Sequence, residues 1–393
     1  MKKYRSIIQF GILIIALLLA IWSQSWFLIV LVFVSTVFLW SHSIRRKVTQ
    51  RVDRLSRLQY KVGEWLLAIA IAVFAIWFTH RFVYSLLTIR STSMQPAYYS
   101  DELIVINKLA YGPAVNADNS NRYRRLSGYS RIKRGDVIAF YFPEGDTVFQ
   151  DHSKEYYYFI KRQVETTKTS NPLLKSPLVY NSVSDRIPFI KRIVGLPGDT
   201  LKISEGDVWV NRRYAPSNDF AVKKFRINNK TTDSVKEKIL KRAYESYREG
   251  DDQVVEIKEK VMYENGWSIY LDKMVDPMNR PSPYVFPFSE GYFWNGSFLG
   301  PVAIPTKGQT VQLTLTNLPL YRRIIQCYEG NTLTVDNQSV YINNKRTNEY
   351  TFKMNYYWVA GDNVSHSFDS RFWGFVPENH IIGKVSWLRC SPH

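Results

Sequence analysis

The segment that is most informative about the fold is FIKRIVGLPGD, residues 189–199. Four of its first six residues are Phe, Ile or Val, which favour strands. The following Gly195-Leu196-Pro197-Gly198 is typical of a tight turn. We therefore expect a strand that carries Lys191 and ends at this turn. The same letters, FIKR, occur at residues 159–162, but QVET follows them there, without a glycine turn. We expect Lys161 to be an ordinary strand residue.

The region around this stretch, roughly residue 85 onward, is rich in short β-favouring runs separated by Gly, Pro, Asn and Asp. The clearest runs are 103–107, 136–142, 207–211, 311–315 and 332–335. Such spacing predicts a mostly antiparallel β domain. One segment differs, because residues 233–248 are strongly charged and carry Val235, Ile239 and Ala243 at helical spacing. We expect a helix there, on an inserted α/β lobe.

The N-terminal region carries three apolar, uncharged runs: Ile7–Trp22, Trp26–Trp40 and Trp65–Phe78. Each approaches the length of about 20 residues that a membrane-spanning helix needs, once flanking aromatic and neutral residues are included. The segment 22–26, WSQSW, is a poor signal-peptide cleavage site. We therefore predict an uncleaved anchor over residues 1–84, with about three transmembrane helices, although two remain an alternative.

Basic residues set the expected orientation of this anchor. The loop at 43–62 holds seven Lys and Arg against one acid, Asp53, and Lys2, Lys3 and Arg5 precede the first run. The positive-inside rule places both segments in the cytoplasm. The third span then leads outward, so that residues 85–393 form an extracytoplasmic domain.

The net charge of +18 does not indicate nucleic-acid binding. Residues 1–62 hold ten basic residues and one acid, so +9 of the charge belongs to membrane topology and the rest is spread thinly. The remaining excess of positive charge is better explained by attraction to anionic lipid headgroups. Two cysteines, Cys327 and Cys390, are too few for a disulfide framework or a metal cluster. We expect neither a metal nor a cofactor, and whether the two cysteines pair stays open.

The candidate chemistry centres on Ser93, in RSTSMQP at residues 90–96. A serine becomes a useful nucleophile only when a base removes its proton. None of the six histidines shows a triad signature, and no G-x-S-x-G motif surrounds Ser93. A lysine can serve as the base if an apolar site lowers its pKa. Lys191 follows Pro188-Phe189-Ile190, an apolar approach that suits this role.

A third segment, GDNVSHSFDSRFWG at residues 361–374, completes a pattern. RSTSMQP, FIKRIVGLPGD and this segment, in that order after a membrane-length run, resemble the conserved boxes of type I signal peptidases. These are the membrane-bound Ser/Lys proteases (leader peptidases, peptidase family S26) that remove signal peptides from exported proteins. The similarity covers the anchor and residues of roughly 85–142, 188–212 and 300–385. Residues 145–187 and 213–299 look like large insertions.

The resemblance implies a role for each matching position. Ser93 would be the nucleophile and Lys191 the general base. The Ser91 hydroxyl and the Ser93 backbone N–H would form the oxyanion hole. Ser367 would hold the lysine, and Asp369 and Arg371 would support the site as an ion pair. Shallow pockets for small substrate residues would be lined by Leu87, Ile89, Met94, Phe189, Ile190 and Phe368.

Some positions depart from the family pattern. Phe368 stands where alanine is usual, and residues 364–366, VSH, replace a charged segment. These departures bear on the pocket and not on the Ser/Lys pair. His366, three residues before Asp369, would permit a Ser/His/Asp site instead, but we expect an ordinary loop histidine because the boxes are complete without it. An aromatic cluster at 284–294 would either dip into lipid headgroups or, as we favour, form the core of the insertion.

The resemblance thus implies a bacterial signal peptidase of type I, a serine endopeptidase that cuts after small residues at positions −1 and −3 of signal peptides. The expected location is the cytoplasmic (inner) membrane, multi-pass, with the catalytic domain on the periplasmic face. Expected partners are signal peptides, the lipid bilayer and, as a further candidate, the secretion translocon. The alternative is a catalytically silent, membrane-anchored binding protein of the export pathway.

Overall fold

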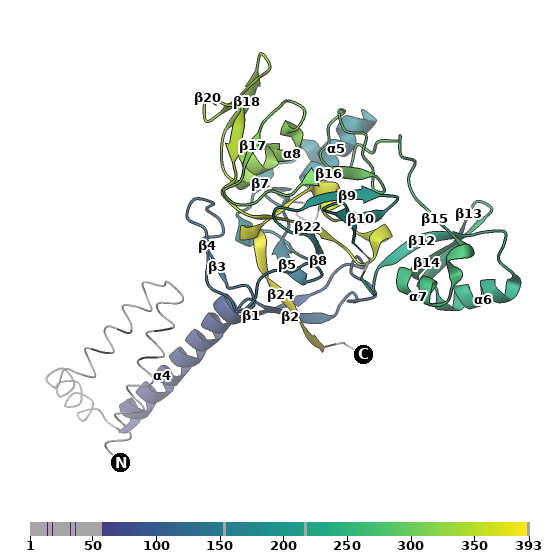
Figure 1. Cartoon of the computed structure of the whole chain (residues 1–393). Coiled ribbons are helices and arrows are strands. Elements are labelled where there is room, and N and C mark those ends of the chain that lie inside the picture. Colours follow the sequence, from purple (N-terminus) through teal and green to yellow (C-terminus); the bar gives the residue numbers. More distant parts are fainter. Residues whose placement is uncertain are drawn as a thin grey trace. The chain divides into compact units, whose positions relative to one another are not determined.

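The computed structural model describes residues 57–151, 155–215 and 218–390, and the single positions 14, 18, 32 and 36 (Figure 1). Two compact units are present. The first comprises residues 1–85 with 108–113 and 126–129, and the second comprises 86–107, 114–125 and 130–393. The described part of the second unit is mostly β, as the sequence predicts.

The first unit contains helix α4, Arg57–Phe78, which continues as a π-helical turn, Thr79–Val83. Within the described residues, Lys61–Val83 is the segment long and apolar enough to cross a membrane. It includes the third predicted span, and apolar side chains such as Trp65 and Ile69 are exposed along it, as a lipid-facing helix requires. The first two apolar runs and most of the basic loop lie outside the described residues. The count of three spans stays a prediction.

The central sheet of the second unit has seven strands in the order β1-β2-β24-β5-β8-β22-β23. Neighbouring strands from β2 to β23 pair antiparallel. The strands are β1 Tyr84–Thr88, β2 Leu103–Asn107, β5 Val137–Tyr141, β8 Pro188–Gly195, β22 Tyr356–Ala360, β23 Val376–Pro377 and β24 Ile381–Cys390. Strands β8 and β22 thereby bring the second and third sequence boxes side by side, although they are far apart in the chain.

A second sheet of four strands follows in the order β11-β10-β9-β16: β9 Thr200–Ser204, β10 Asp207–Val210, β11 Arg213–Tyr214 and β16 Leu299–Ala303. The unit also contains smaller sheets and a helix. These are the pair β3 Ala114–Val115 and β4 Arg124–Arg125, the pair β17 Thr310–Gln312 and β21 Glu349–Thr351, and the three strands β18 Leu333–Asp336, β19 Ser339–Ile342 and β20 Lys345–Arg346. The helix is α8, Leu318–Arg323. Each of the five predicted strand runs overlaps an observed strand.

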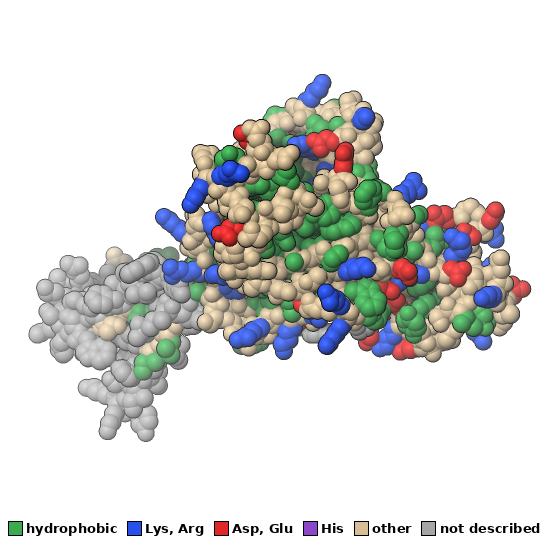
Figure 2. Space-filling model, turned by 45° about the horizontal axis from the view of Figure 1, so that its top comes forward, with side chains coloured by type: hydrophobic (Ala, Val, Ile, Leu, Met, Phe, Trp, Pro, Cys, Tyr) green, Lys and Arg blue, Asp and Glu red, His purple; other side chains and the backbone are tan. Residues whose placement is uncertain are grey.

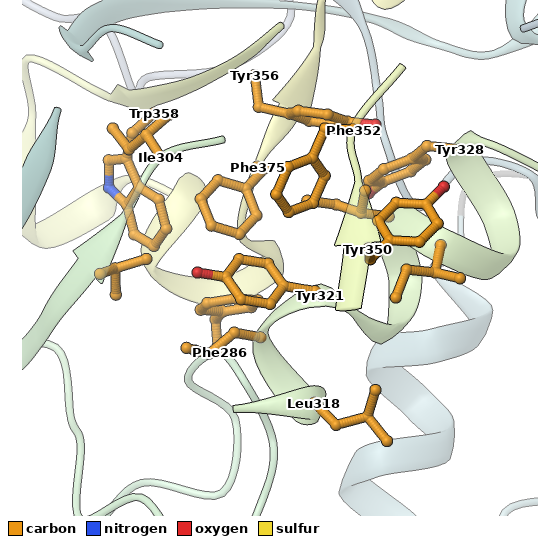
Figure 3. Packing of buried hydrophobic residues seen from close by; sticks show 14 of the residues in the cluster. Phe286, Ile304, Leu318, Tyr321, Tyr328, Tyr350, Phe352, Tyr356, Trp358 and Phe375 are labelled. Carbon is orange, nitrogen blue, oxygen red and sulfur yellow. The ribbon is translucent and has the colours of Figure 1, made fainter. Parts of the chain in front are cut away.

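The main hydrophobic core joins these sheets, and the aromatic cluster belongs to it. Phe286 is buried and packs edge-on against Trp358 of β22 and against Phe375 (Figure 3). Tyr292 and Trp294 pack against the same core, whereas Phe293 is exposed. The cluster is therefore a core element, as favoured from the sequence, but it completes the core of the central domain and not a separate core of the insertion.

The segment 222–273 forms a lobe with its own core. Its sheet, β13-β14-β12-β15, comprises β12 Val222–Ile227, β13 Glu245–Glu249, β14 Asp252–Lys258 and β15 Leu271–Lys273. Helices α6 Asp233–Arg242 and α7 Glu259–Glu264 and the 3-10 turn Trp267–Ile269 accompany it. Buried apolar side chains join sheet to helices: Phe225, Ile239, Val255, Ile257, Met262, Trp267 and Leu271. Basic and acidic side chains are interspersed on its surface (Figure 2).

The predicted helix at 233–248 is correct only for its first ten residues. Helix α6 ends at Arg242, and residues 245–249 are the edge strand β13, which pairs with β14. Alternating charged residues can face water on an edge strand as readily as on a helix, so the charge pattern did not distinguish the two.

The other inserted segment contains β6 Thr147–Phe149, helix α5 Tyr157–Thr167, a 3-10 turn Pro172–Lys175, β7 Leu178–Tyr180 and a second turn Val183–Asp185. Lys161 lies on α5 and is exposed. The expectation of a strand at Lys161 is therefore wrong: the Gln, Glu and Thr that follow FIKR there continue a helix.

Candidate active site

Strand β8 positions Lys191 in the centre of the main sheet. Ile138 of β5 stands opposite Lys191, and Val359 and Ala360 of β22 pair with Ile193 and Arg192 on the other side. With sheet on both flanks, the lysine side chain is only 3% exposed. After β8, the turn contains Gly198 at φ +88, a left-handed conformation that glycine adopts without strain.

Ser93 lies in a tight turn that follows β1, where the Gln95 N–H donates to the Thr92 carbonyl at 3.0 Å. Its side chain is 4% exposed. The Ser93 hydroxyl and the Lys191 amine are joined by a hydrogen bond. The two residues singled out from the sequence, 98 positions apart, therefore form a buried pair.

Burial is the main influence on the charge of Lys191. It lowers the pKa of the amine from 10.5 to about 8, opposed by the negative charges of Asp369 and Asp362 and assisted by Arg371. At pH 7 an amine with a pKa near 8 is neutral in about one molecule in ten, compared with about one in three thousand at 10.5. The site thus makes a free amine lone pair available beside Ser93 at neutral pH.

The third box closes over the Ser93 turn through main-chain contacts. The Asn363 N–H donates to the Ser93 carbonyl at 3.1 Å. A Cβ atom added at Gly361 would lie 2.2 Å from Ser367 Oγ and 2.5 Å from the Ser93 carbonyl oxygen. Only glycine fits this approach, since real Cβ atoms do not come so close to other heavy atoms. Glycine at 361 therefore lets the box pack directly on the turn that holds Ser93.

Asp369 and Arg371 form the ion pair that the resemblance implies. The guanidinium donates to both carboxylate oxygens, with Nε–Oδ1 at 2.9 Å and Nη2–Oδ2 at 3.0 Å, and the Gly361 N–H adds a bond of 3.2 Å. Although Asp369 is fully buried, the Arg371 charge and these bonds hold its pKa below the usual value. Arg371 also donates to the Val364 carbonyl at 2.7 Å, so the pair fixes the loop.

Ser367 is buried beside this pair. Its Oγ has no partner in regular hydrogen-bond geometry among the described residues, although the hydroxyl lies near enough to Asp369 to help lower the pKa of that carboxyl. The structure places Ser367 next to Gly361, and a direct bond from Ser367 to Lys191 is not formed. Its role in holding the lysine stays a prediction.

A second ion pair was missed by the sequence reasoning. Arg192, next to Lys191, binds Asp362 of the third box through two bonds of 2.7 and 2.6 Å. Asn218 donates to the same carboxylate at 2.8 Å. Both charged residues lie inside the motifs, but a pairing across 170 positions leaves no local signal. The pair fastens β8 to the loop that covers Ser93.

Ser91 is an exposed residue of the segment that leads into the Ser93 turn. Its hydroxyl is 3.1 Å from Ser93 Oγ, close enough to share a ligand atom with it. The side chain is exposed to solvent.

The six predicted pocket residues fall into two groups. Ile89, Met94 and Ile190 are buried in one apolar cluster, with Leu87 packed against it. Phe189 belongs to an aromatic group in which its ring stacks on Phe142 at 4.7 Å, and Phe368 stacks on Tyr156 at 5.7 Å. The bulky residue at 368 therefore packs against the insertion that carries Tyr156. Which of the six touch substrate stays a prediction.

His366 faces the lobe. Its Nε2 is 2.9 Å from Glu256 Oε1 on β14. His366 is exposed and lies in the loop, and its absence from the Ser/Lys chemistry stays a prediction.

Comparison with known proteins agrees with the motifs. A family model described as signal peptidase, peptidase S26, matches residues 62–389. Signal peptidase I of Buchnera aphidicola subsp. Schizaphis graminum is 21% identical over 327 residues, covering 80% of this chain and 71% of that protein. Signal peptidase I P of Bacillus subtilis subsp. natto is 20% identical over 159 residues, covering 40% and 56%.

A shorter match is closer in sequence. Signal peptidase I of Haemophilus influenzae is 48% identical over 46 residues, which are 12% of this chain and 13% of that protein. The similarity to this relative thus spans only a small part of its length. The family model, in contrast, extends from the apolar helix to the last strand and spans all three boxes. The chain therefore belongs to the peptidase S26 signal peptidase family, a family of serine proteases.

Proposed function

We propose that this protein is a membrane-anchored serine endopeptidase that removes signal peptides from exported preproteins, with Ser93 as the nucleophile and Lys191 as the general base. The observation that carries the proposal is the buried hydrogen bond between these two side chains, together with the lowered pKa of the lysine. A silent binding protein would have no need of a desolvated amine beside a serine.

The proposed chemistry begins with Lys191 in its neutral form. Its lone pair accepts the Ser93 hydroxyl proton while Oγ attacks the carbonyl carbon of the scissile bond. The resulting ammonium then gives the proton to the leaving amine, so that the C–N bond breaks and an ester to Ser93 remains. Lys191 next takes a proton from a water molecule, which attacks the ester and releases the new carboxyl group and free Ser93.

Negative charge develops on the substrate oxygen in each tetrahedral intermediate. The Ser91 hydroxyl and the Ser93 backbone N–H are the proposed donors to it. The 3.1 Å separation of the two hydroxyl oxygens supports this, because a group bonded to Ser93 would come within reach of Ser91. The Asp369–Arg371 and Arg192–Asp362 pairs support the site by fixing the loop and strand that hold its reacting groups.

The proposed specificity is for small residues at positions −1 and −3 before the cut. Apolar shallow pockets reject larger side chains, since overfilling costs about 1 to 3 kcal/mol. We propose Leu87, Ile89, Met94, Phe189, Ile190 and Phe368 as their lining. Model preproteins that differ only at −1 and −3, cleaved and sequenced at the new N-terminus, test this. Efficient cleavage after Leu or Phe would overturn the assigned specificity, and an unchanged profile in Phe368→Ala would place Phe368 outside the pocket.

The proposed setting is a bacterial cytoplasmic membrane, with residues 1–84 as a multi-pass anchor and 85–393 on the extracytoplasmic face. The apolar helix Lys61–Val83 supports one span. Membrane lipid and the translocon that delivers preproteins are the proposed neighbours there.

The decisive experiment is a gel assay of one preprotein with the purified full chain and its Ser93→Ala variant. The proposal predicts cleavage by the wild type and none by Ser93→Ala. If the wild type bound the preprotein but did not cut it, the silent binding alternative would replace the enzyme.

A further inference from the structure

Two glutamates stand opposite each other on the lobe. Strands β13 and β14 pair so that Glu245 faces Glu256. Like charges at directly opposed positions of a sheet repel and destabilise the pairing. Glu256 is moreover 0% exposed, and a buried carboxylate normally needs a cation, a proton or several hydrogen bonds.

His366 of the third box completes the cluster. Its Nε2 is 2.9 Å from Glu256 Oε1, and one donor atom from each of the three residues lies within 4.8 Å of the other two. The second carboxylate oxygen, Glu256 Oε2, is buried and has no hydrogen-bond partner among the described residues. A fully buried oxygen of this kind implies an unfilled interaction at the cluster.

A second pair of opposed acids on the same hairpin has the cationic partners that Glu245 and Glu256 lack. Glu249 and Asp252 also face each other across β13 and β14. There Lys224 Nζ lies 2.8 Å from Glu249 and Arg226 Nε 2.9 Å from Asp252, so both acids are neutralised. In the part of the chain that the structure describes, neither Glu245 nor Glu256 has a Lys or Arg in ion-pair contact. One imidazole stands against two carboxylates.

We propose that Glu245, Glu256 and His366 bind a divalent transition-metal ion of the zinc type. An imidazole nitrogen with two carboxylate oxygens is a donor set that Zn²⁺ accepts, with water completing four-coordination. Tetrahedral bonds of about 2.0–2.1 Å separate the ligand atoms by about 3.3 Å. The three residues must therefore close in slightly, which the exposed side chains of Glu245 and His366 permit.

The ion has a structural consequence, because its ligands come from two parts of the fold. Glu245 and Glu256 belong to the lobe, whereas His366 adjoins Ser367 in the loop that covers Ser93. Other contacts join the same parts: the Val222 N–H donates to the Asp362 carbonyl at 2.9 Å, and the Tyr244 hydroxyl is hydrogen-bonded to Gln95 of the turn that holds Ser93. The bound metal would fasten the lobe to the rim of the site. It would take no part in bond breaking.

The test uses the full chain without a histidine tag, purified in detergent and stripped with a chelator. Zn²⁺ is added, free metal is removed by dialysis, and the bound metal is measured by mass spectrometry. Co²⁺ in place of Zn²⁺ reports tetrahedral coordination through its visible absorption. We expect about one equivalent for the wild type, and a tenfold or greater loss of affinity for Glu245→Gln, Glu256→Gln and His366→Ala.

Asp252→Asn is the matched control, since it removes an acid from the same hairpin whose partner, Arg226, does not stand opposite Glu256, and it should bind like the wild type. If Glu256→Gln does not fold, the exposed Glu245→Gln still decides the matter. Three outcomes would overturn the proposal: no zinc retained by the wild type, equal zinc retained by the cluster variants, or binding of Mg²⁺ or Ca²⁺ only. A His366–Glu256 ion pair alone predicts the first of these. No readout depends on proteolysis, so the proposal stands or falls apart from the proposed function.

Discussion

The tetrapeptide FIKR occurs twice in this chain with two different structures. At residues 159–162 it lies on helix α5, and at 189–192 it lies on strand β8. The isoleucine is buried in both copies. Lys161, however, is exposed to water, whereas Lys191 is buried against Ser93. Identical residues thus give a solvent-exposed side chain in one place and a candidate base in the other.

The difference arises from the flanking sequence. The first copy is followed by Gln163-Val164-Glu165-Thr166, which continues a helix, and its lysine lies on the exposed side of that helix. The second copy begins at Pro188 and ends in the Gly195–Gly198 turn, and β5 and β22 flank it. The pKa of a lysine therefore follows from what surrounds it after folding, and local sequence alone does not set it.

The largest expected effect separates the two lysines. Lys191→Ala should lower preprotein cleavage by roughly 10²- to 10⁴-fold, because the general base is lost, and Lys161→Ala should leave it within about twofold. Both rates are measured with one preprotein at equal concentrations of folded protein. An inactive Lys161→Ala with an active Lys191→Ala would reverse the assignment of the base.

Replacing the arginine of each FIKR copy should affect different properties of the protein. Arg162 binds the buried Glu144 through bonds of 2.9 and 2.8 Å, so Arg162→Ala should lower the free energy of unfolding by about 3 to 5 kcal/mol. Its rate per folded molecule should hardly change. Arg192→Ala, which frees Asp362 at the third box, should lower both stability and rate. Denaturant unfolding and cleavage assays on both variants make the comparison, and an equal loss of rate in the two would contradict it.

Ser91 lies near the lysine of the second FIKR copy, because its hydroxyl is 3.1 Å from the Ser93 hydroxyl that is bonded to Lys191. Ser91→Ala should reduce the catalytic rate by roughly ten- to a thousandfold, since one oxyanion donor contributes up to about 4 kcal/mol. Its exposed position predicts an unchanged melting temperature. Single-turnover rates and thermal unfolding measure the two effects. A rate within twofold of the wild type would argue against a side-chain donor.

Burial of Lys191 should also cost stability. Its folded pKa of about 8 lies below the ordinary 10.5, so the burial penalty is fully present below pH 8 and fades as pH rises to 10.5. Lys191→Met should therefore raise the free energy of unfolding at pH 7 by about 1 to 3 kcal/mol, because one pKa unit corresponds to about 1.4 kcal/mol. Lys161→Met should change it by less than about 0.5 kcal/mol. Denaturant titrations of both variants at pH 7 and pH 10 measure this difference. A gain for Lys191→Met that is as large at pH 10 as at pH 7 would contradict a lowered pKa of Lys191.

The last prediction leaves both lysines in place and concerns the pH dependence of cleavage. If neutral Lys191 is the base, the cleavage rate should rise about tenfold per pH unit below its pKa and level off above about pH 8. The Lys161→Ala variant should show the same profile. A rate that is already flat above pH 7 would point to a histidine base instead.

Much of the site could be predicted from the sequence, because motif residues and their order are local information. Ser93 and Lys191 form the expected pair, and Asp369 and Arg371 the expected ion pair. The β-rich domain follows from runs of strand-forming residues, and the Gly195–Gly198 turn ends β8 as predicted. The membrane-length segment was likewise evident from hydropathy.

Other features depend on contacts between distant residues and carry no such signal. The Arg192–Asp362 pair and the contact of His366 with Glu256 each join positions more than a hundred apart, so residue spacing gave no sign of them. The lysine of the first FIKR copy was assigned to a strand because four residues suit either structure. Glu245–Arg248 were assigned to a helix because edge strands tolerate the same charges.

The lobe at 222–273 has a final consequence, for the history and engineering of the chain. Its first and last strands, β12 and β15, are antiparallel neighbours, and the last residue of β15, Lys273, stands opposite Phe225 near the start of β12, so the chain enters and leaves the lobe at neighbouring places. A lobe whose ends are neighbours and whose core is its own can be inserted, exchanged or removed without displacing the strands of the two main sheets. A short Gly-containing bridge could thus replace the lobe, and a foreign module grafted there would lie close to the loop that covers Ser93.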